Sequence, residues 1–174
     1  MISLEEAVDE REFRAAMTRL AKCAAVTTAL GPAGPVGCTT TSLMSLSVAP
    51  PSVLVAFQYG SRTLDDIQAA GRFVINVLSH EQGSLVRRFA TGSARERFRG
   101  LEYTVAHGAP LLSGAAVSLV CDLQQSLRAL DHILLVGSVR DLRAAAAAPL
   151  VLVTGEPHTT VPALPRPTTP DDIR

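Results

Sequence analysis

The sequence contains no tryptophan, only 4% aromatic residues and three cysteines in 174 positions. Cys23, Cys38 and Cys121 form no CxxC pair and no Cys/His spacing suited to zinc, and an odd number cannot complete a disulfide framework. A reducing compartment, the cytoplasm, is therefore the expected location. The chain also lacks a Walker loop and a GxGxxG segment, which argues against a nucleotide site of either kind.

The chain has no excess charge of either sign, because 16 Lys and Arg balance 16 Asp and Glu. A neutral chain offers no general positive field for nucleic acid or for an anionic membrane. Residues 23–61 carry no charge, but prolines, glycines and many hydroxyl residues interrupt them, so no apolar helix of membrane-spanning length fits. The first residues are acidic where a secretory signal would be basic. We expect a soluble protein with no nucleic-acid or membrane partner.

The remaining composition, 47% hydrophobic and 18% charged, is that of a globular chain of about one domain. Residue patterns predict helices within 1–20, 63–70 and 79–90, each beginning at a capping box (Ser3/Glu6, Thr63/Asp66 and Ser79/Gln82). They predict strands on both sides of a turn at 31–35 and over 52–59, 73–78, 115–123, 133–139 and 150–153. About seven strands without regular helix alternation favour a mainly β fold, a small antiparallel barrel with peripheral helices. The Pro-rich tail, 162–174, is expected to be extended or disordered.

Residues 37–47 contain six hydroxyl side chains and no charged group. Hydroxyls and backbone amides on a strand edge suit a neutral, planar ligand that needs donors and acceptors along its rim. Hydroxyls bonded to neighbouring backbone are the simpler explanation of this composition taken by itself.

The segment Ser61-Arg62-Thr63 lies between a predicted strand and a predicted helix. Free amides, two hydroxyls and a guanidinium at such a place are groups that bind phosphate. Capping of the helix by Thr63 is the alternative, and Asp65 and Asp66 already supply negative charge there. Both interpretations stay open on composition alone.

Two further features have a simple and a functional interpretation. Five arginines with only Glu96 opposing them form either a solvated face or a basic rim for an anionic cofactor: Arg87, Arg88, Arg95, Arg97 and Arg99.

His132 begins a strongly apolar strand beside Asp131, where it is either a turn residue or a group that orients a ligand or moves a proton. No catalytic triad, HExxH or paired-carboxylate pattern supports hydrolysis.

Several segments occur together in a specific order: Gly37-x-Thr39-x-x-Ser42-x-x-Ser45, Pro50-Pro51, Ser61-x-Thr63-Leu64, Gly71-Arg72-Phe73-x-x-Asn76-Val77-Leu78, Arg88-Phe89, Asp131-His132 and Gly137-x-Val139. Over roughly residues 13–153 the chain thereby resembles the flavin reductase domain family, the small reductase components of two-component flavin-dependent monooxygenases. The resemblance implies an FMN-binding split β-barrel of antiparallel strands with short helices over 13–161, preceded by a helical extension over 1–12.

The same resemblance implies a homodimer with the flavin near the subunit interface. It implies an NAD(P)H:flavin oxidoreductase that passes a hydride from NADH or NADPH to FMN, or to FAD, and supplies reduced flavin to a monooxygenase component. The resemblance implies that the isoalloxazine ring lies along Thr39, Thr40, Thr41 and Ser42, with Ser45 beyond them. It implies that Ser61, Arg62 and Thr63 hold the phosphate and that Arg88 and Phe89 border the flavin. It places His132 at the catalytic position near the nicotinamide. Asn76 is interpreted as a buried structural amide.

The chain departs from the family pattern at two places. Leu130 replaces the glycine of a Gly-Asp-His motif, and leucine avoids backbone angles that glycine reaches. Residues 151–157 lack the aromatic and basic side chains of many relatives. Two alternatives therefore stand beside the reductase: a flavin carrier or degenerate flavin-binding dimer without turnover, and a structural or partner protein without cofactor.

Overall fold

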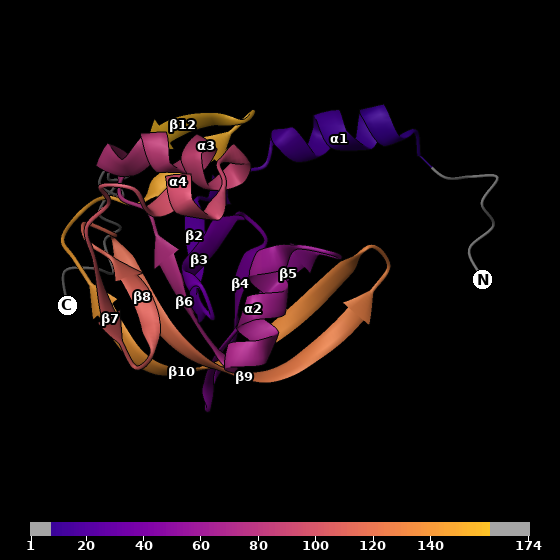
Figure 1. Cartoon of the computed structure of the whole chain (residues 1–174). Coiled ribbons are helices and arrows are strands. Elements are labelled where there is room, and N and C mark those ends of the chain that lie inside the picture. The colour runs from indigo at the N-terminus through magenta and orange to yellow at the C-terminus, as the bar shows by residue number, and fades with distance from the viewer. Residues whose placement is uncertain (1–7, 161–174) are drawn as a thin grey trace, which may run out of the picture.

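The computed structural model describes residues 8–160 and shows a curled antiparallel sheet flanked by helices (Figure 1). The main sheet has the strand order β3-β2-β6-β9-β10-β5-β4, and each neighbouring pair is antiparallel. Its strands are β2 (Ala25–Gly31), β3 (Gly34–Thr40), β4 (Leu43–Val48), β5 (Pro51–Gln58), β6 (Arg72–Val77), β9 (Val117–Ala129) and β10 (His132–Ala144). The helices are α1 (Glu10–Thr18), α2 (Arg62–Ala70), α3 (Gly83–Thr91) and α4 (Ala94–Phe98), with a 3₁₀ turn, η2, at His80–Gln82.

Two smaller sheets complete the fold. One has the order β1-β11-β12, and the other is the hairpin β7-β8. These strands are β1 (Lys22–Cys23), β7 (Tyr103–Ala106), β8 (Ala109–Leu112), β11 (Leu150–Val153) and β12 (Glu156–Thr159). No helix within residues 8–160 has both the length and the apolar character that crossing a bilayer requires.

Strands β2 and β6, in the middle of the sheet, are buried on both faces over most of their length. In β6, Phe73 and Ile75 point into the barrel, where they pack with α2, whereas Val74 packs against the β7-β8 hairpin. Alternate residues of a strand point to opposite faces, so double burial favours consecutive apolar residues, here Phe73 to Ile75. Asn76 faces outward from the same strand and is fully buried.

Helix α2 closes one end of the barrel by burying Leu64 and Ile67 in its core. It ends at Gly71, whose φ of 67° is the left-handed conformation that glycine reaches without strain. Helices α3 and α4 cover an outer face through Phe89 and Phe98, whose rings meet edge to face with centroids 5.2 Å apart. The helical layer therefore lies beside β3, the edge strand of the main sheet.

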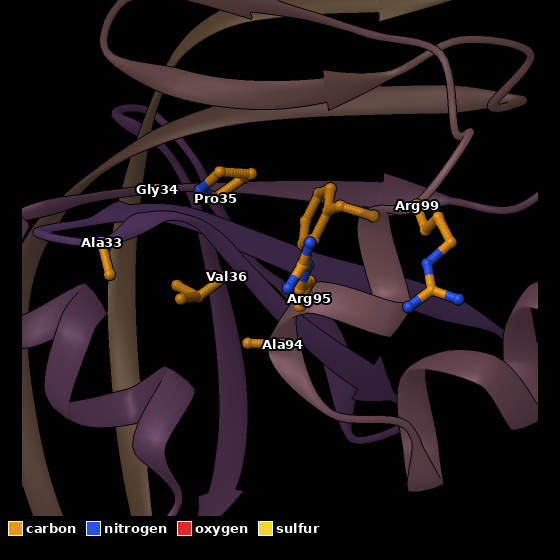
Figure 2. Close-up of a pocket in the computed structure, with 8 residues that line it drawn as sticks. Ala33, Gly34, Pro35, Val36, Ala94, Arg95 and Arg99 are labelled. Carbon is orange, nitrogen blue, oxygen red and sulfur yellow. The ribbon is translucent and has the colours of Figure 1, made fainter.

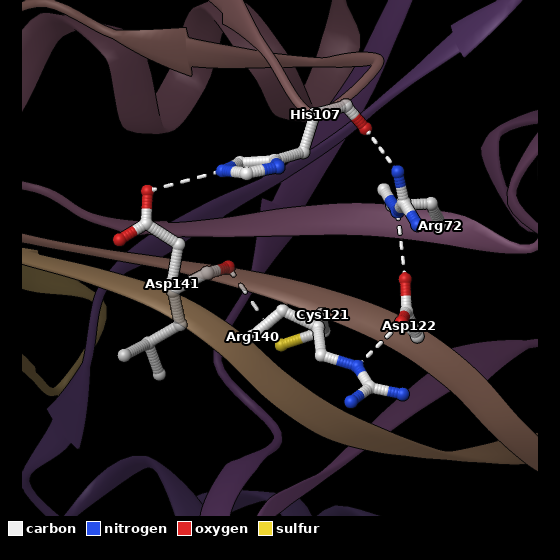
Figure 3. A network of polar contacts seen from close by, with 7 residues as sticks. Arg72, His107, Cys121, Asp122, Arg140 and Asp141 are labelled. Atoms are coloured by element: carbon white, nitrogen blue, oxygen red, sulfur yellow. Dashed lines mark hydrogen bonds and ion pairs between the residues drawn. The ribbon is translucent and has the colours of Figure 1, made fainter.

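A polar network fastens the sheet to the β7-β8 hairpin (Figure 3). Asp122 accepts hydrogen bonds from Arg72 Nε at 2.7 Å and from Arg140 Nε at 2.6 Å, and Arg72 Nη1 donates to the carbonyl of His107 at 2.7 Å. The Arg72 hydrogen bond, followed by that of Arg140, holds the pKa of Asp122 below its ordinary value. Strands β6, β9 and β10 are thus linked through one carboxylate.

The structure corrects several predictions about individual elements. Helix α2 begins after Ser61, so Thr63 lies inside the helix and is buried rather than capping it. The predicted last strand is followed by β12, and the β7-β8 hairpin and α4 were not predicted. The described part of the chain has twelve strands where about seven were expected. The capping box at Ser79 and Gln82 is present.

The first helix differs from its prediction at both ends. It spans Glu10–Thr18 and is capped by Asp9, whose carboxylate accepts from the amides of Arg11 and Glu12. This helix crosses the expected boundary between residues 12 and 13. The predicted capping box at Ser3 and Glu6 and the Pro-rich tail lie outside the described residues.

Candidate functional site

A cavity of about 510 Å³ lies between the edge strand β3, the first turn of α2 and the segment joining α3 to α4. Its wall includes Gly37, Cys38, Ser61, Arg62, Thr63 and Arg97. The structure therefore brings the three residues of the predicted phosphate segment to one cavity, next to the start of the hydroxyl-rich segment.

The first turn of α2 supplies hydrogen-bond donors to this cavity. Ser61 precedes the helix in an extended conformation, and its hydroxyl makes no capping bond. The first amides of an α-helix have no intrahelical acceptor, and the helix dipole makes this end partly positive. Arg62 adds a full positive charge, whereas the Asp66 carboxylate in the same wall offsets part of it.

Arg97 is a charged residue of this cavity that the predicted site did not include. Its Nη1 donates to the carbonyl of Gly37 at 2.6 Å, and its Nε is buried without a hydrogen-bond partner among residues 8–160. Buried donors are nearly always paired, so the unpaired Nε makes Arg97 a candidate for contact with a ligand in this cavity. The arginine run was recognised in the sequence, but nothing in its spacing distinguishes Arg97 from Arg95 or Arg99.

Arg97 is held beside strand β3 by its hydrogen bond to Gly37, which is itself closely packed. A side-chain carbon at Gly37 would lie 3.0 Å from the carbonyl oxygen of Thr27 and 3.2 Å from Phe89 Cε1, so only glycine fits there without displacement. Arg88 donates from Nε to the Glu96 carbonyl at 3.1 Å and from Nη2 to the Arg99 carbonyl. Arg88 and Phe89 thus brace the segment that carries Arg97, and neither lines the cavity.

The four hydroxyls assigned to the ring divide into two pairs. Thr39 donates to the Val86 carbonyl at 2.6 Å, and the Thr40 hydroxyl lies 2.8 Å from that of buried Thr27. Thr41 and Ser42 make no side-chain hydrogen bond within the described residues, and Ser42 is exposed. The first pair bonds strand β3 to α3 and to β2. The second pair offers free donors and acceptors where the strand ends. 

Ser45 lies apart from this group. It is on β4 and lines a separate apolar hollow with Leu43 and Val53.

One end of β5 connects the free hydroxyls, the histidine and the helix start. The amide of Ala56 donates to the Ser42 carbonyl at 3.0 Å, His132 pairs in register with Gln58, and the Ser61 amide donates to the Gln58 carbonyl at 3.2 Å. The segments carrying Ser42, His132 and Ser61 therefore meet at this end of the barrel.

His132 is half-buried, and its Nδ1 lies 2.8 Å from Asp131 Oδ1. This hydrogen bond is the main cause of a lowered pKa for Asp131. Because Nδ1 faces the carboxylate, Nε2 is the ring nitrogen left for another group.

Asn76 is a fully buried polar residue with a structural role. Asn76 Nδ2 donates to the Val26 carbonyl at 3.1 Å, and its Oδ1 accepts from the Leu112 amide at 2.9 Å and from the Ser118 hydroxyl at 3.1 Å. The prediction of a buried structural amide is confirmed.

Burial raises the pKa of the Cys38 thiol, although Thr63 and Arg97 oppose part of that shift.

Comparisons with known proteins identify the family of this chain. Residues 17–160 match the family model described as flavin reductase like domain. A flavin reductase from Pseudomonas putida is 33% identical over 142 residues, which are 80% of this chain and 83% of that protein. An NADH:riboflavin 5'-phosphate oxidoreductase from Streptomyces pristinaespiralis is 36% identical over 164 residues, with 91% of this chain and 93% of that protein covered.

A solved structure extends the likeness to three dimensions. Nitrilotriacetate monooxygenase component B from Mycobacterium thermoresistibile has a TM-score of 0.85 at 27% identity, with 97% of both chains covered. The predicted antiparallel split-barrel fold is confirmed, and the predicted activity is the one that the curated relatives are named for. The chain belongs to the flavin reductase like domain family.

Proposed function

We propose that this protein is an NAD(P)H:flavin oxidoreductase that supplies reduced flavin to a monooxygenase component. The observation that carries the proposal is the buried, unpartnered Nε of Arg97 in a cavity that α2 also lines with its first turn. Such a cavity suits the phosphate of a flavin nucleotide, and the family membership makes flavin the ligand class to expect.

The residues divide the work of binding. Ser61, Arg62 and Thr63 at the start of α2, together with Arg97, would hold the phosphate. Thr41 and Ser42 would bond the rim of the ring, while Thr39 and Thr40 keep the strand in place. A bound flavin supplies the hydride-accepting chemistry, and the protein supplies binding, orientation and electrostatics. Contacts of Ser45, Arg88 and Phe89 with flavin stay predictions.

His132 would orient the nicotinamide through Nε2, because Asp131 holds the ring by Nδ1. A group with this role acts on the rate of flavin reduction more than on flavin affinity. His132→Ala should therefore slow reduction in an anaerobic stopped-flow mixing experiment and leave the flavin titration nearly unchanged. Equal reduction rates for the variant and the wild type would remove His132 from the mechanism.

A homodimer is proposed from an exposed apolar surface on β4. Met44, Leu46 and Val48 are exposed there, and an apolar hollow of about 370 Å³ next to them is lined by residues of β4, β5, β9 and β10. Contiguous exposed apolar surface of this kind marks an association site. Sedimentation velocity should give a dimer that Val48→Lys weakens, and a wild-type monomer would contradict this proposal.

One experiment separates the reductase from its alternatives. Purified protein is mixed with FMN under nitrogen, binding is followed by flavin absorbance, and NADH or NADPH is then added. Binding followed by bleaching supports the reductase, and the more efficient donor identifies the nucleotide. The Streptomyces relative is named for NADH and riboflavin 5'-phosphate, which makes this pair the first to test. Binding without bleaching would favour a carrier, and no binding would favour a structural protein.

A further inference from the structure

A carboxylate lies in the wall of the cavity to which the proposed function assigns the flavin phosphate, which we call the phosphate cavity. The charged side chains of this wall are Arg62 and Asp66 from α2 and Arg97 from α4. They give the cavity two positive charges and one negative charge. An acid in the wall of an anion site opposes binding of the anion, so the presence of Asp66 calls for a functional explanation.

The arginines next to this cavity do not pair with the carboxylate. Arg95 and Arg99 lie in an adjoining cavity of about 590 Å³, and the side chains of Val36 and Ala94 belong to the walls of both cavities (Figure 2). Neither arginine lines the phosphate cavity. Within residues 8–160, Asp66 forms no ion pair with any basic side chain. No neighbouring cation therefore neutralises its charge.

Packing fixes the position of this carboxylate. Asp66 follows Arg62 by four residues, so both lie on the same face of α2, where an ion pair could form. The structure instead places the carboxylate against Gly31 at the end of β2. A side-chain carbon at Gly31 would lie 2.8 Å from Asp66 Oδ1 and 3.0 Å from its Cγ, so the absence of a side chain there leaves room for the carboxylate. Asp66 is thus held half-buried in the cavity wall.

We infer that Asp66 lowers the affinity of the protein for the flavin phosphate and thereby speeds the release of reduced flavin. This inference rests on the proposed function, because it takes the phosphate cavity as the place where the flavin is anchored. A phosphate monoester carries about −1.5 to −2 charges at pH 7. Two arginines and one aspartate leave the cavity a single net positive charge, and without Asp66 the two arginines would balance the phosphate.

Incomplete attraction suits a protein that must let its product leave. The phosphate takes no part in hydride transfer, so its contacts are the same before and after the reaction. Such uniform binding holds substrate and product alike and does not accelerate the chemical step. Tight binding of the product would instead make its release limiting. A carboxylate that weakens the phosphate contact therefore shortens the time for which reduced flavin stays bound and leaves hydride transfer unaffected.

Asp66→Asn tests this role, because it removes the charge and keeps the shape of the side chain. In a fluorescence titration the variant should bind FMN roughly three- to tenfold more tightly than wild type, the size expected for one like charge in a solvated cavity. Riboflavin, which has no phosphate, should keep its affinity within about twofold. FMN dissociation after rapid dilution should slow by a similar factor, since related complexes differ mostly in dissociation rate.

Asp65→Asn is the matched control. Asp65 is the neighbouring acid in the first turn of α2, is exposed and does not line the phosphate cavity. Its replacement removes the same charge from the same helix and should change the FMN affinity by less than about twofold. A salt titration adds a second measurement. NaCl should weaken FMN binding more steeply in Asp66→Asn than in wild type, because the unopposed arginines attract the phosphate more strongly.

The outcomes separate this inference from the proposed function. If wild type binds both flavins and Asp66→Asn leaves FMN affinity unchanged, the role of Asp66 is overturned and the reductase proposal stands. An equal gain in FMN affinity from Asp65→Asn would overturn it as well, because the effect would then come from net charge and not from the cavity. Weaker binding of both flavins by Asp66→Asn would show that the carboxylate accepts a hydrogen bond from the ligand, and the inferred repulsion would be wrong. Failure of wild type to bind any flavin would overturn the proposed function together with this inference.

Discussion

Replacement of Arg97 by methionine tests the phosphate cavity most directly. Methionine keeps an unbranched side chain of similar length and removes the guanidinium. In wild type, Arg97 Nη1 bonds to the Gly37 carbonyl, and Nε is buried with no partner among the described residues. The guanidinium of this half-buried side chain is therefore only partly satisfied by the protein itself, which is unusual for a group with a buried donor.

The two effects of the substitution on the flavin-free protein oppose each other. Loss of the bond to Gly37 removes about 1 kcal/mol or somewhat more, and relief of the desolvated Nε returns about 1–3 kcal/mol. We therefore expect the free energy of unfolding in urea to stay unchanged or to rise by up to about 2 kcal/mol. A purely structural arginine would instead show a large loss of stability.

The effect on ligand affinity should be much larger and should depend on the phosphate. A hydrogen bond to a charged partner contributes about 1.5–3 kcal/mol, so FMN should bind roughly ten- to a hundredfold more weakly to the variant. Riboflavin, which has no phosphate, should bind with an affinity within about twofold of that for the wild type. Fluorescence titration with both ligands measures the difference.

Two companion variants sharpen the comparison. Arg62 lies at the same cavity but is exposed, so Arg62→Ala should weaken FMN by only a few-fold, about 1 kcal/mol or less. Arg87→Met removes an exposed arginine of α3 that does not line the phosphate cavity, and it should change the affinity for neither FMN nor riboflavin. Equal losses of FMN and riboflavin affinity in Arg97→Met, or a destabilised variant that keeps FMN affinity, would refute the assignment of Arg97 to the phosphate.

Three further predictions concern the framework around the site. Asn76→Ala should lower the free energy of unfolding in urea by about 3 kcal/mol or more, because it leaves the buried Leu112 amide and Val26 carbonyl without their amide partner; a loss below about 1 kcal/mol would contradict this. Asp122→Asn should cost about 1 kcal/mol at neutral pH. Because the folded-state pKa of Asp122 is lowered, this difference should persist above the ordinary value of 3.8 and vanish as the pH falls through the folded-state pKa, so a difference that grows in acid would refute it. Leu130→Gly should raise the free energy of unfolding by up to about 1 kcal/mol, measured by urea unfolding, since Leu130 holds a φ of 55° with its side chain exposed; a loss of stability would show that the turn is not strained.

Elements with two buried faces could be predicted from the sequence, whereas exposed ones could not. Strand β6 has an apolar run that is buried on both faces, and β5 buries one face and half-buries the other. Gly71 marks the end of α2 by its conformation. All four residues of β12 are exposed, so its sequence has no alternation of apolar and polar residues from which a strand could be predicted. Helix α4 has five residues, too few for a helical period to be seen.

The candidate site was predictable to the same uneven extent. Ser61, Arg62 and Thr63 are consecutive, so a local pattern is enough to select them as one group. Arg97 reaches the cavity only because α4 packs beside β3, a long-range contact that no spacing within the arginine run records. Thr39 and Thr40 were selected because hydroxyl side chains suit a ligand, but their hydroxyls bond to Val86 and Thr27 of the protein itself. The hydroxyl content of a segment does not separate these two uses.

The hairpin that presents His132 bears on whether the protein can be catalytic. Leucine at position 130 motivated the carrier alternative, because it replaces the glycine of the family motif. Leu130 adopts the left-handed angle that a glycine would provide, and the strain stays at one exposed residue. His132 is positioned instead by β10, which pairs with β5 in unbroken register from His132 opposite Gln58 to Ser138 opposite Ser52. The leucine therefore costs stability without displacing the histidine, and Leu130→Gly should leave the rate of flavin reduction unchanged; a substantially faster variant would show that the turn limits the reaction after all.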